Sequence, residues 1–361
     1  MKIAQVAPLC ESCPPQLYGG TERVVSYLTE ELVALGHQVT LFAAGDSQTS
    51  ATLEPGCERA LRLSGTCRDP LAHHLVMLYR VRQRAGEFDI LHLHTDYLHF
   101  PLFADLAEKT VTTLHGRLDV PDLPVIMREF PTMPLVSISQ AQQAPIPWAN
   151  WRGTVLHGLP GDLHRAGSGA GGYLAFLGRI SPEKGADRAI AIARRAGLPL
   201  QIAAKVDRQD EEYYAHQVAP LLNDPLIEYV GEIGEADKGA FLGDALALLF
   251  PIDWPEPFGL VLIEAMATGT PVIAFRRGAV PEIVEDGLTG FIVDDVAGAA
   301  AALQLVPAMD RAAIRRRFEE RFTAPRMAQD YLALYRSQLS AAAGSGYFAE
   351  KPARRTIEAA E

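Results

Sequence analysis

Two glutamates that lie eight positions apart, Glu256 and Glu264, flank a glycine in the stretch DWPEPFGLVLIEAMATG, residues 253–269. A proline on each side of Glu256 restricts the backbone ahead of a predicted helix, which Gly269 ends. Gly259 lets a ligand approach the main chain, and the helix N-terminus offers unpaired N–H groups to an anion such as pyrophosphate. Carboxylates only accept hydrogen bonds, so they suit hydroxyl groups. The stretch therefore predicts a ligand with hydroxyls on both sides of an anionic centre, with Glu264 about two helical turns in.

Two cations indicate where the negative charge of such a ligand would be neutralised. Arg179 and Lys184 lie in GRISPEKG, residues 178–185, where a predicted strand turns into a predicted helix. A guanidinium fork and a flexible ammonium at a helix start are suited to a diphosphate, since charged donors neutralise it. The alternative is a solvated pair of surface charges.

A pair of glycines follows the first predicted strand. Gly19 and Gly20 precede Thr21, which is a natural N-cap for the helical pattern that continues to Gly36. The order strand, Gly-Gly, helix lets backbone N–H groups meet a phosphate. For an isolated glycine pair, a tight turn is the simpler interpretation.

Histidines occur near the ends of two further predicted strands. His92, His94 and Asp96 alternate along one strand face. They could bind a metal ion, but nothing nearby completes a ligand shell, so we expect them to line a cleft at the strand's carboxyl end. His115 ends the next strand, and a single histidine there is usually a polar loop residue.

The four cysteines are Cys10, Cys13, Cys57 and Cys67. The C-x-x-C spacing of the first two could hold zinc or a redox disulfide. The second pair is spaced by nine residues instead and no thioredoxin-like pattern surrounds the first, so we expect reduced thiols.

The order of predicted elements is that of an α/β protein. Apolar strands alternate with helices in both halves, and the glycine-rich segment 161–172 reads as a linker between them. A chain of 361 residues is long for one hydrophobic core. We therefore predict two Rossmann-like, doubly wound domains that face each other across a central cleft.

Composition excludes some classes of function. The 44 acidic residues outnumber the 33 basic ones, which argues against a nucleic-acid-binding protein. No run of about 18 apolar residues could span a bilayer, and the chain enters a strand directly after Met1, so we expect a cytoplasmic protein. The arginines of the predicted helix 71–86 form no clean stripe, so membrane contact is expected to be peripheral at most.

The PEP and FGLVLIE segments around Glu256 and Glu264 resemble the signature of the retaining, family-four glycosyltransferases of the GT-B fold. In that family the first glutamate holds the donor sugar and the second holds the ribose hydroxyls. GRISPEKG is similar to the family's second signature, and GGTERVV to its donor loop in the first domain. The family usually has Asn-Gly where this chain has His157-Gly158, which leaves the role of that loop open.

The resemblance implies roles for individual residues. His115 would lie over the donor sugar near the reacting carbon, and the implied catalytic residues are His115, Glu256, Arg179 and Lys184. The implied donor-binding residues are Gly19, Gly20, Arg179, Lys184, Ile233, Glu256, Phe258, Gly259, Leu260, Val261 and Glu264.

The resemblance also implies how the domains share the work. We expect an acceptor-side domain over residues 1–165 and a nucleotide-sugar-binding domain over 166–323. A last helix over 324–342 would cross back onto the first domain, and 343–361 would be a flexible tail.

The predicted reaction is transfer of a sugar, with retained configuration, from a nucleoside diphosphate sugar to a glycan, lipid or small-molecule acceptor. The donor sugar is expected to be linked to UDP or GDP. The lack of an Asp-x-Asp motif predicts that no metal takes part, and no other cofactor is expected. A nucleotide-sugar epimerase, a phosphorylase, and an inactive nucleotide-sugar-binding module remain alternatives. A Rossmann oxidoreductase is not supported, because no G-x-G-x-x-G follows the first strand.

Overall fold

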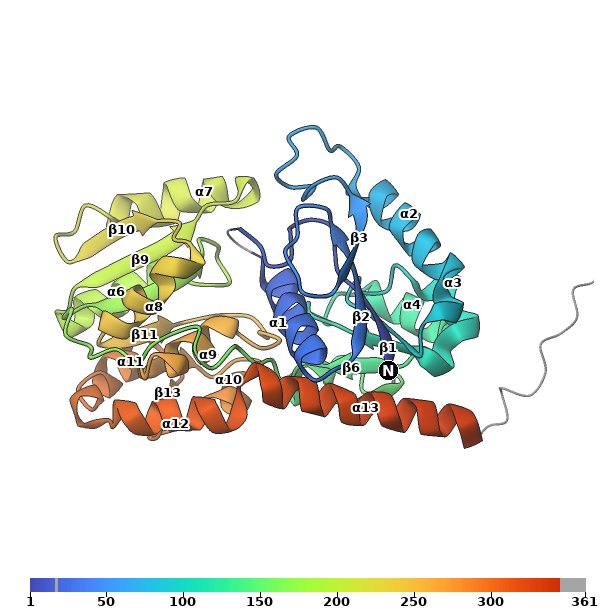
Figure 1. The fold of residues 1–361 in the computed structure, drawn as a ribbon. Coiled ribbons are helices and arrows are strands. Elements are labelled where there is room, and N and C mark those ends of the chain that lie inside the picture. The colour runs from blue at the N-terminus through green and yellow to red at the C-terminus, as the bar shows by residue number, and fades with distance from the viewer. Residues whose placement is uncertain (17–18, 345–361) are drawn as a thin grey trace, which may run out of the picture.

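The protein contains two parallel β-sheets, each packed against helices, in two lobes that lie side by side (Figure 1). The structure is a computed structural model that describes residues 1–16 and 19–344, with the side chains of 342–344 left out. The two doubly wound α/β sheets confirm the architecture predicted from the alternation of strands and helices.

The sheet of the first lobe has seven strands in the order β3-β2-β1-β4-β5-β6-β7. The order reverses between β1 and β4, which is where open α/β sheets bind ligands at the carboxyl ends of their strands. The strands are β1 (Lys2–Val6), β2 (Gln38–Ala44), β3 (Thr52–Cys57), β4 (Ile90–Leu93), β5 (Thr110–Thr113), β6 (Leu135–Ser137) and β7 (Trp151–Thr154).

The helices of the first lobe cover this sheet. The long helix α1 buries Val24, Val25, Leu28 and Leu32, the periodic positions expected from the sequence. The helices are α1 (Gly20–Ala34), α2 (Pro70–Gln83), α3 (Phe100–Phe103), α4 (Leu123–Glu129) and α5 (Gln140–Gln143).

The sheet of the second lobe has six strands in the order β10-β9-β8-β11-β12-β13, so its order reverses between β8 and β11. The strands ALLF (247–250) and VIAF (272–275) are continuous buried apolar runs, as expected for a parallel sheet covered on both faces, whereas the edge strand IEYVG (227–231) is partly exposed. The six strands are β8 (Leu174–Arg179), β9 (Leu200–Lys205), β10 (Ile227–Gly231), β11 (Ala247–Phe250), β12 (Val272–Phe275) and β13 (Gly290–Val293).

The remaining helices follow these strands in turn. They are α6 (Ala186–Ala196), α7 (Glu211–Tyr213), α8 (Glu235–Asp244), α9 (Leu260–Ala267), α10 (Val280–Ile283), α11 (Val296–Ala302), α12 (Arg311–Arg321) and α13 (Ala324–Gly344).

Two details differ from the sequence-based expectations. The sequence pattern of the polar residues 45–70 predicts no strand, yet β3 lies there. This strand holds a proline and a glycine, and both are tolerated because β3 lies at the edge of its sheet. Helix α1 begins at Gly20 with Gly19 as its N-cap, so Thr21 lies inside the helix and is not the cap.

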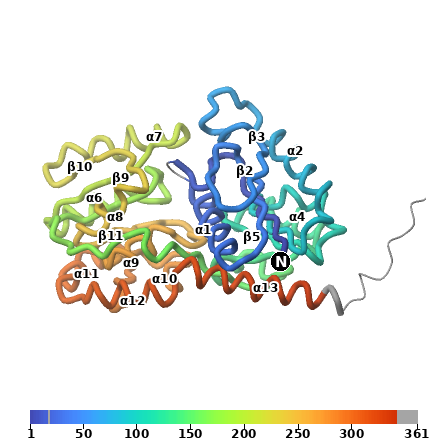
Figure 2. The backbone as a smooth tube through the Cα atoms, viewed as in Figure 1, coloured from blue at the N-terminus to red at the C-terminus, as the bar shows by residue number. Residues whose placement is uncertain are grey.

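The last helix, α13, runs back along the base of the first lobe (Figures 1 and 2). Its side chains Met327, Tyr331 and Tyr335 are fully buried in a core cluster that includes Ile3 of β1 and Leu28 of α1. Backbone hydrogen bonds join Ala324 and Phe322 to Leu159 at the point where the chain crosses between the lobes. The predicted tail falls mostly on residues 345–361, which lie outside the described residues.

Candidate active site

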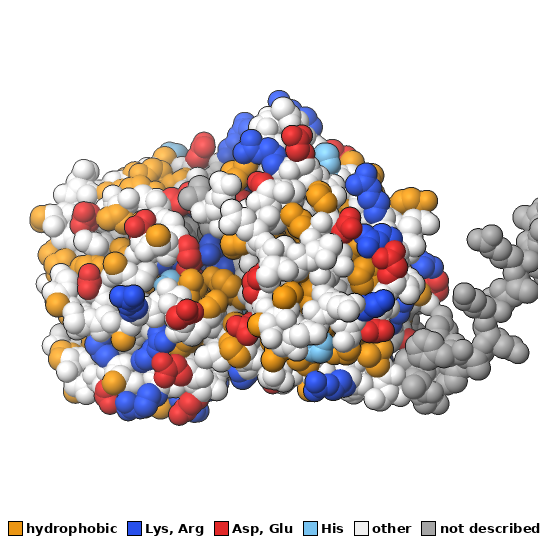
Figure 3. Space-filling model, viewed as in Figure 1, with side chains coloured by type: hydrophobic (Ala, Val, Ile, Leu, Met, Phe, Trp, Pro, Cys, Tyr) orange, Lys and Arg blue, Asp and Glu red, His pale blue; other side chains and the backbone are white. Residues whose placement is uncertain are grey.

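A cavity of about 540 Å³ lies between the two lobes, and residues from both line it. The space-filling view shows the groove between the lobes, with acidic and basic side chains in it (Figure 3). The structure brings together here every residue proposed from the sequence for the donor and for catalysis: Gly19, Gly20, His115, Arg179, Lys184, Ile233, Glu256, Phe258, Gly259, Leu260, Val261 and Glu264.

Two glycines shape the walls of the cavity. Gly259, the N-cap of α9, has a φ of 86°, a left-handed conformation that favours glycine. A Cβ on Gly19 would lie 2.8 Å from the Cβ of Pro15, so the N-cap of α1 also has no room for a side chain. The main chain at both helix starts is therefore accessible to a ligand in the cavity.

Glu264 is the fifth residue of α9 and only 3% exposed. It therefore lies just over one turn into the helix, closer to the N-terminus than the two turns expected from the sequence. Because α9 begins at Leu260, Glu256 precedes the helix and Glu264 follows its first turn.

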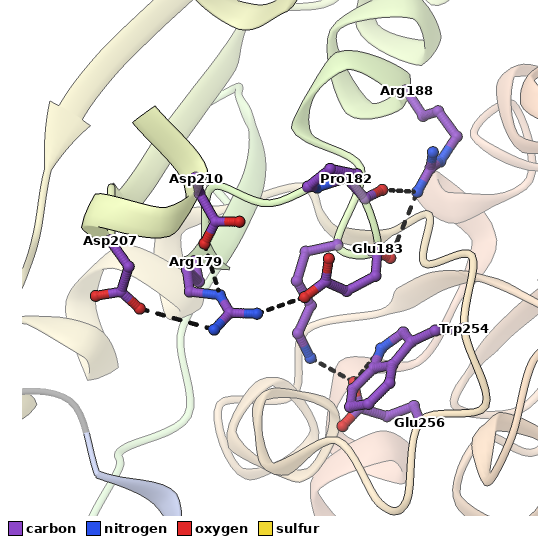
Figure 4. A network of polar contacts seen from close by, with 9 residues as sticks. Arg179, Pro182, Glu183, Arg188, Asp207, Asp210, Trp254 and Glu256 are labelled. Carbon is purple, nitrogen blue, oxygen red and sulfur yellow. Dashed lines mark hydrogen bonds and ion pairs between the residues drawn. The ribbon is translucent and has the colours of Figure 1, made fainter. Parts of the chain in front are cut away.

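Glu256 forms an ion pair with Lys184, which lies between β8 and α6. The indole Nε1 of Trp254 donates a hydrogen bond to the same carboxylate oxygen at 3.1 Å (Figure 4). The ammonium of Lys184 also lies 5.0 Å from the centroid of the Trp254 ring. Glu256, which is 8% exposed, is thus held in place by a cation and an N–H donor.

Arg179, at the carboxyl end of β8, lies among three carboxylates (Figure 4). It is paired with Glu183, its Nη1 lies 3.7 Å from Asp207, and its Nε lies 3.4 Å from Asp210. A diphosphate bound by Arg179 would therefore replace carboxylates as the partner of this guanidinium.

Glu264 is joined to the first lobe through two cations that sequence reasoning missed. Lys238 Nζ lies 2.9 Å from Glu264 and 3.3 Å from Glu235, and Glu235 in turn pairs with Arg23 of α1. Burial alone would raise the pKa of Glu264, but the attraction and hydrogen bond of Lys238, together with the charges of His164 and Arg23, outweigh burial and lower that pKa. Glu264 is therefore ionised and ready to accept hydrogen bonds.

His164, Glu235 and Glu264 have ligand atoms within 4.8 Å of one another, a spacing that could suit a metal ion. Arg23 and Lys238 already pair with these two carboxylates. The cluster consequently balances two negative charges with two positive ones, and a divalent cation would have to displace them.

His115 lies on the first-lobe wall of the cavity and is held from behind by His94, whose Nδ1 is 2.8 Å from His115 Nε2. His157 stacks on it with ring centroids 5.2 Å apart and an interplanar angle of 17°. Burial lowers the pKa of His115 to about 3 and that of His157 well below its usual range, so both rings are neutral. The His157-Gly158 departure from the family pattern thus places a second imidazole on the cavity wall.

The expectation that His92 and His94 line the cleft is wrong. Neither is on the cavity wall, and both are buried behind His115, where other side chains are hydrogen-bonded to both of their ring nitrogens. Asp96 is exposed on the loop that follows β4. Strand β4 ends at Leu93, so of these three residues only His92 lies on the strand, and Asp96, with a φ of 48°, does not continue its alternation.

The four cysteines are free thiols, as expected from their spacing. Cys10 lies on the cavity wall, and burial raises its pKa, which keeps it protonated and unreactive.

The missed residues carried weak signals in the sequence. Lys238 lies one turn into the helix that follows β10, and Arg23 lies one turn into the helix that follows Gly19. Each is an ordinary helix cation until the fold brings the two helices to opposite sides of Glu235.

Two known families match separate parts of the chain, one in each lobe. Residues 169–322 match the family described as "Glycosyl transferases group 1", and residues 18–153 match the one described as "Glycosyltransferase Family 4". The chain belongs to the family-four glycosyltransferases.

Individual relatives agree with this assignment. The glycosyltransferase is 26% identical to a phosphatidyl-myo-inositol mannosyltransferase of Mycobacterium leprae, over 88% of this chain and 90% of the relative. It superimposes on sucrose-phosphate synthase from Thermosynechococcus elongatus with a TM-score of 0.76 at 19% identity, covering 94% of this chain and 99% of the other. For HepE of Anabaena in complex with UDP and glucose, the TM-score is 0.71 at 19% identity, covering 93% and 100%. These structural matches confirm the GT-B fold.

Among residues 1–16 and 19–344, no helix combines the length and the hydrophobicity that crossing a membrane requires.

Proposed function

We propose that this glycosyltransferase moves a sugar from a UDP- or GDP-linked donor to a hydroxyl-bearing acceptor, with retained configuration and without a metal ion. The observation that carries the proposal is the placement of Glu256 and Glu264 on either side of the α9 N-terminus, in one cavity with Arg179 and Lys184. A nucleoside diphosphate sugar has this same order of groups: hydroxyls, diphosphate, hydroxyls.

In this proposal the second lobe holds the donor. Glu264, ionised and oriented by Lys238, accepts hydrogen bonds from the ribose hydroxyls, while Glu256 accepts them from the sugar. Arg179, Lys184 and the N–H groups that open α9 bind the diphosphate. The relatives support the nucleotide, since HepE was solved with UDP and with UDP-glucose.

The same cations serve the chemical step. Negative charge grows on the leaving diphosphate as the glycosidic bond breaks, so fixed positive charges stabilise the transition state more than the ground state. Lys184 and Arg179 thereby provide the positive charge that a divalent ion provides in metal-dependent enzymes. The first lobe would supply the acceptor and His115.

Calorimetric titration with UDP, GDP and ADP, followed by product analysis with the preferred donor, tests this function. We expect one nucleotide to bind most tightly, and NMR of the product to show the anomeric configuration of the donor. Turnover without an acceptor to an isomerised donor would indicate an epimerase. Binding without turnover for any acceptor class would indicate a binding module.

A further inference from the structure

A continuous chain of buried hydrogen bonds leads away from His115 into the first lobe. His115 Nε2 lies 2.8 Å from His94 Nδ1, and His94 Nε2 lies 2.9 Å from the amide oxygen of Gln5. Gln5 and His94 are buried, with exposures of 0% and 2%. No solvent is available to these atoms, so each must donate or accept within the chain.

The Gln5 amide determines which atom is the donor in each of these hydrogen bonds. Its amide oxygen has lone pairs only, so His94 must donate from Nε2. Burial lowers the pKa of His94 well below its usual range, so its neutral ring carries only that one proton. His94 Nδ1 is therefore an acceptor, and His115 donates to it from Nε2.

The nitrogen of the Gln5 amide is hydrogen-bonded on the side opposite His94. Gln5 Nε2 donates to the hydroxyl of Tyr335 at 3.2 Å and lies 3.3 Å from His92 Nδ1. Tyr335, on α13, can then donate to His92 Nδ1 at 2.6 Å.

The hydrogen bonds farthest from His115 agree with this assignment of donors and acceptors. His92 Nε2 donates to the hydroxyl of Thr113 at 2.7 Å, and Thr113 lies 2.9 Å from the hydroxyl of Tyr331. Every link from Tyr331 to His115 then has one donor and one acceptor.

The free end of the chain is His115 Nδ1. Since Nε2 carries the proton of the neutral ring, Nδ1 holds a lone pair. Within the described residues Nδ1 has no hydrogen-bond partner, and the ring lies on the cavity wall.

We propose that Gln5 and His94 are positioning residues that hold His115 as its Nε2–H tautomer, so that Nδ1 accepts a hydrogen bond from a hydroxyl of the bound sugar. The inference rests on the proposed function, because it takes a sugar as the occupant of the cavity. It makes His115 selective for an O–H group, since an ether or a carbonyl oxygen at that place has no proton to donate.

The tautomer can be measured on the wild-type full chain without turnover. Histidine labelled with ¹⁵N gives separate signals for protonated and unprotonated ring nitrogens, and a His115→Gln variant assigns the ring. We expect His115 to be protonated at Nε2 and not at Nδ1 near pH 7. Protonation at Nδ1, or a charged ring, would overturn the proposal. This readout does not depend on whether any sugar is transferred.

Variants test whether the positioning matters. Gln5→Met keeps the length of the side chain but removes the acceptor, so the His115 signals should shift toward a mixture of tautomers. kcat should fall about tenfold, the value of one hydrogen bond, with UDP affinity unchanged. Thr112→Val is the matched control, because it breaks a bond of the same kind, between Thr112 Oγ1 and His99 Nε2 at 2.8 Å.

The control should leave the His115 tautomer unchanged and kcat within twofold of the wild-type value. An unchanged His115 tautomer in Gln5→Met, or an equal fall of kcat in both variants, would refute the positioning role. A wild type that binds UDP but transfers no sugar would instead refute the proposed function while leaving the tautomer measurement valid.

Discussion

Lys238 lies 2.9 Å from Glu264, and its ammonium donates a hydrogen bond to that buried carboxylate. One oxygen of Glu264 is thereby occupied, and the carboxylate is held at a fixed angle to the first turn of α9. An ionised carboxylate has about four lone-pair sites, so Glu264 retains capacity for two ribose hydroxyls. Lys238 therefore orients this carboxylate and leaves some of its lone pairs available to a ligand.

We predict that the two glutamates of the cavity contribute to different steps. Glu264→Ala should weaken binding of the nucleoside diphosphate by about 10- to 100-fold, the value of hydrogen bonds to a charged group. Glu256→Ala should leave that binding nearly unchanged and lower kcat, since Glu256 is assigned to the sugar. Isothermal titration and steady-state kinetics measure the two effects. Equal losses of nucleotide affinity in both variants would contradict this division.

Arg179 should discriminate a diphosphate from a bare nucleoside. Arg179→Ala is expected to weaken nucleoside diphosphate binding by about tenfold or more and to leave the nucleoside almost unaffected. Asp207→Asn is the opposing variant, because it removes a competing charge 3.7 Å from the guanidinium. It should tighten diphosphate binding. Equal losses for both ligands in Arg179→Ala would show that the arginine does not contact the phosphates.

The buried histidines predict a loss of stability in acid. Burial lowers the pKa of His99 and His115 to about 3 and that of His92 and His94 well below the usual range. Below about pH 6.5 the unfolded chain binds protons that the folded chain does not, so the free energy of unfolding rises with pH in this window. Well below pH 6.5, each such histidine lowers the free energy of unfolding by about 1.4 kcal/mol for every unit by which the pH falls. Above pH 6.5 this loss of stability is absent, because the histidine is neutral in both states.

Urea denaturation from pH 7.5 to pH 5 measures this slope. His99→Gln should make the slope shallower, while His216→Gln, at an exposed site, should not change it. A slope that is unaffected by His99→Gln would mean that this ring is protonated in the folded protein.

Chelation should leave transfer activity largely unchanged, because cationic side chains face the place proposed for the diphosphate. Activity measured before and after EDTA treatment tests this. If EDTA abolished activity and a divalent ion restored it, the cluster of His164, Glu235 and Glu264 would become the first candidate site. His92 and His94 would not, since their ring nitrogens are already hydrogen-bonded.

Donor binding should compact the protein. The lobes are joined across the cavity by few polar contacts, such as the Arg23–Glu235 ion pair and the 2.6 Å hydrogen bond from Ser139 to the carbonyl of Pro257. Interfaces between domains that are held by few polar contacts commonly open, so the free protein is expected to open. Small-angle scattering should show a smaller radius of gyration with nucleotide bound. Arg23→Ala should enlarge the free form, and an unchanged radius in every state would contradict closure.

Much of the cavity could be predicted from the sequence, because short motifs carry it. Arg179 ends a strand, and Glu256 precedes a helix start, so the parallel topology alone brings them to one edge of the sheet. Strand β3 was missed because its proline and glycine obscure the apolar pattern of an edge strand.

Contacts between distant elements could not be predicted in this way. Arg23 and Glu235 meet only when both lobes are folded and placed, and nothing in either local sequence encodes the other. The same holds for His92, whose partners Thr113 and Tyr335 come from β5 and from the last helix. Periodicity shows which residues share a strand face but not which face is turned inward.

The crossing of α13 has a consequence for how the protein is made. Tyr331 and Tyr335 complete the core beside β1, yet they are among the last described residues to leave the ribosome. The first lobe therefore cannot finish folding as an N-terminal unit during synthesis, as most domains do. Until α13 has left the ribosome, Gln5 and His92 lack the hydroxyl of Tyr335 that they contact in the native state. An enzyme assembled in this order acquires its ordered His115 only once α13 has been synthesised and has packed against the first lobe.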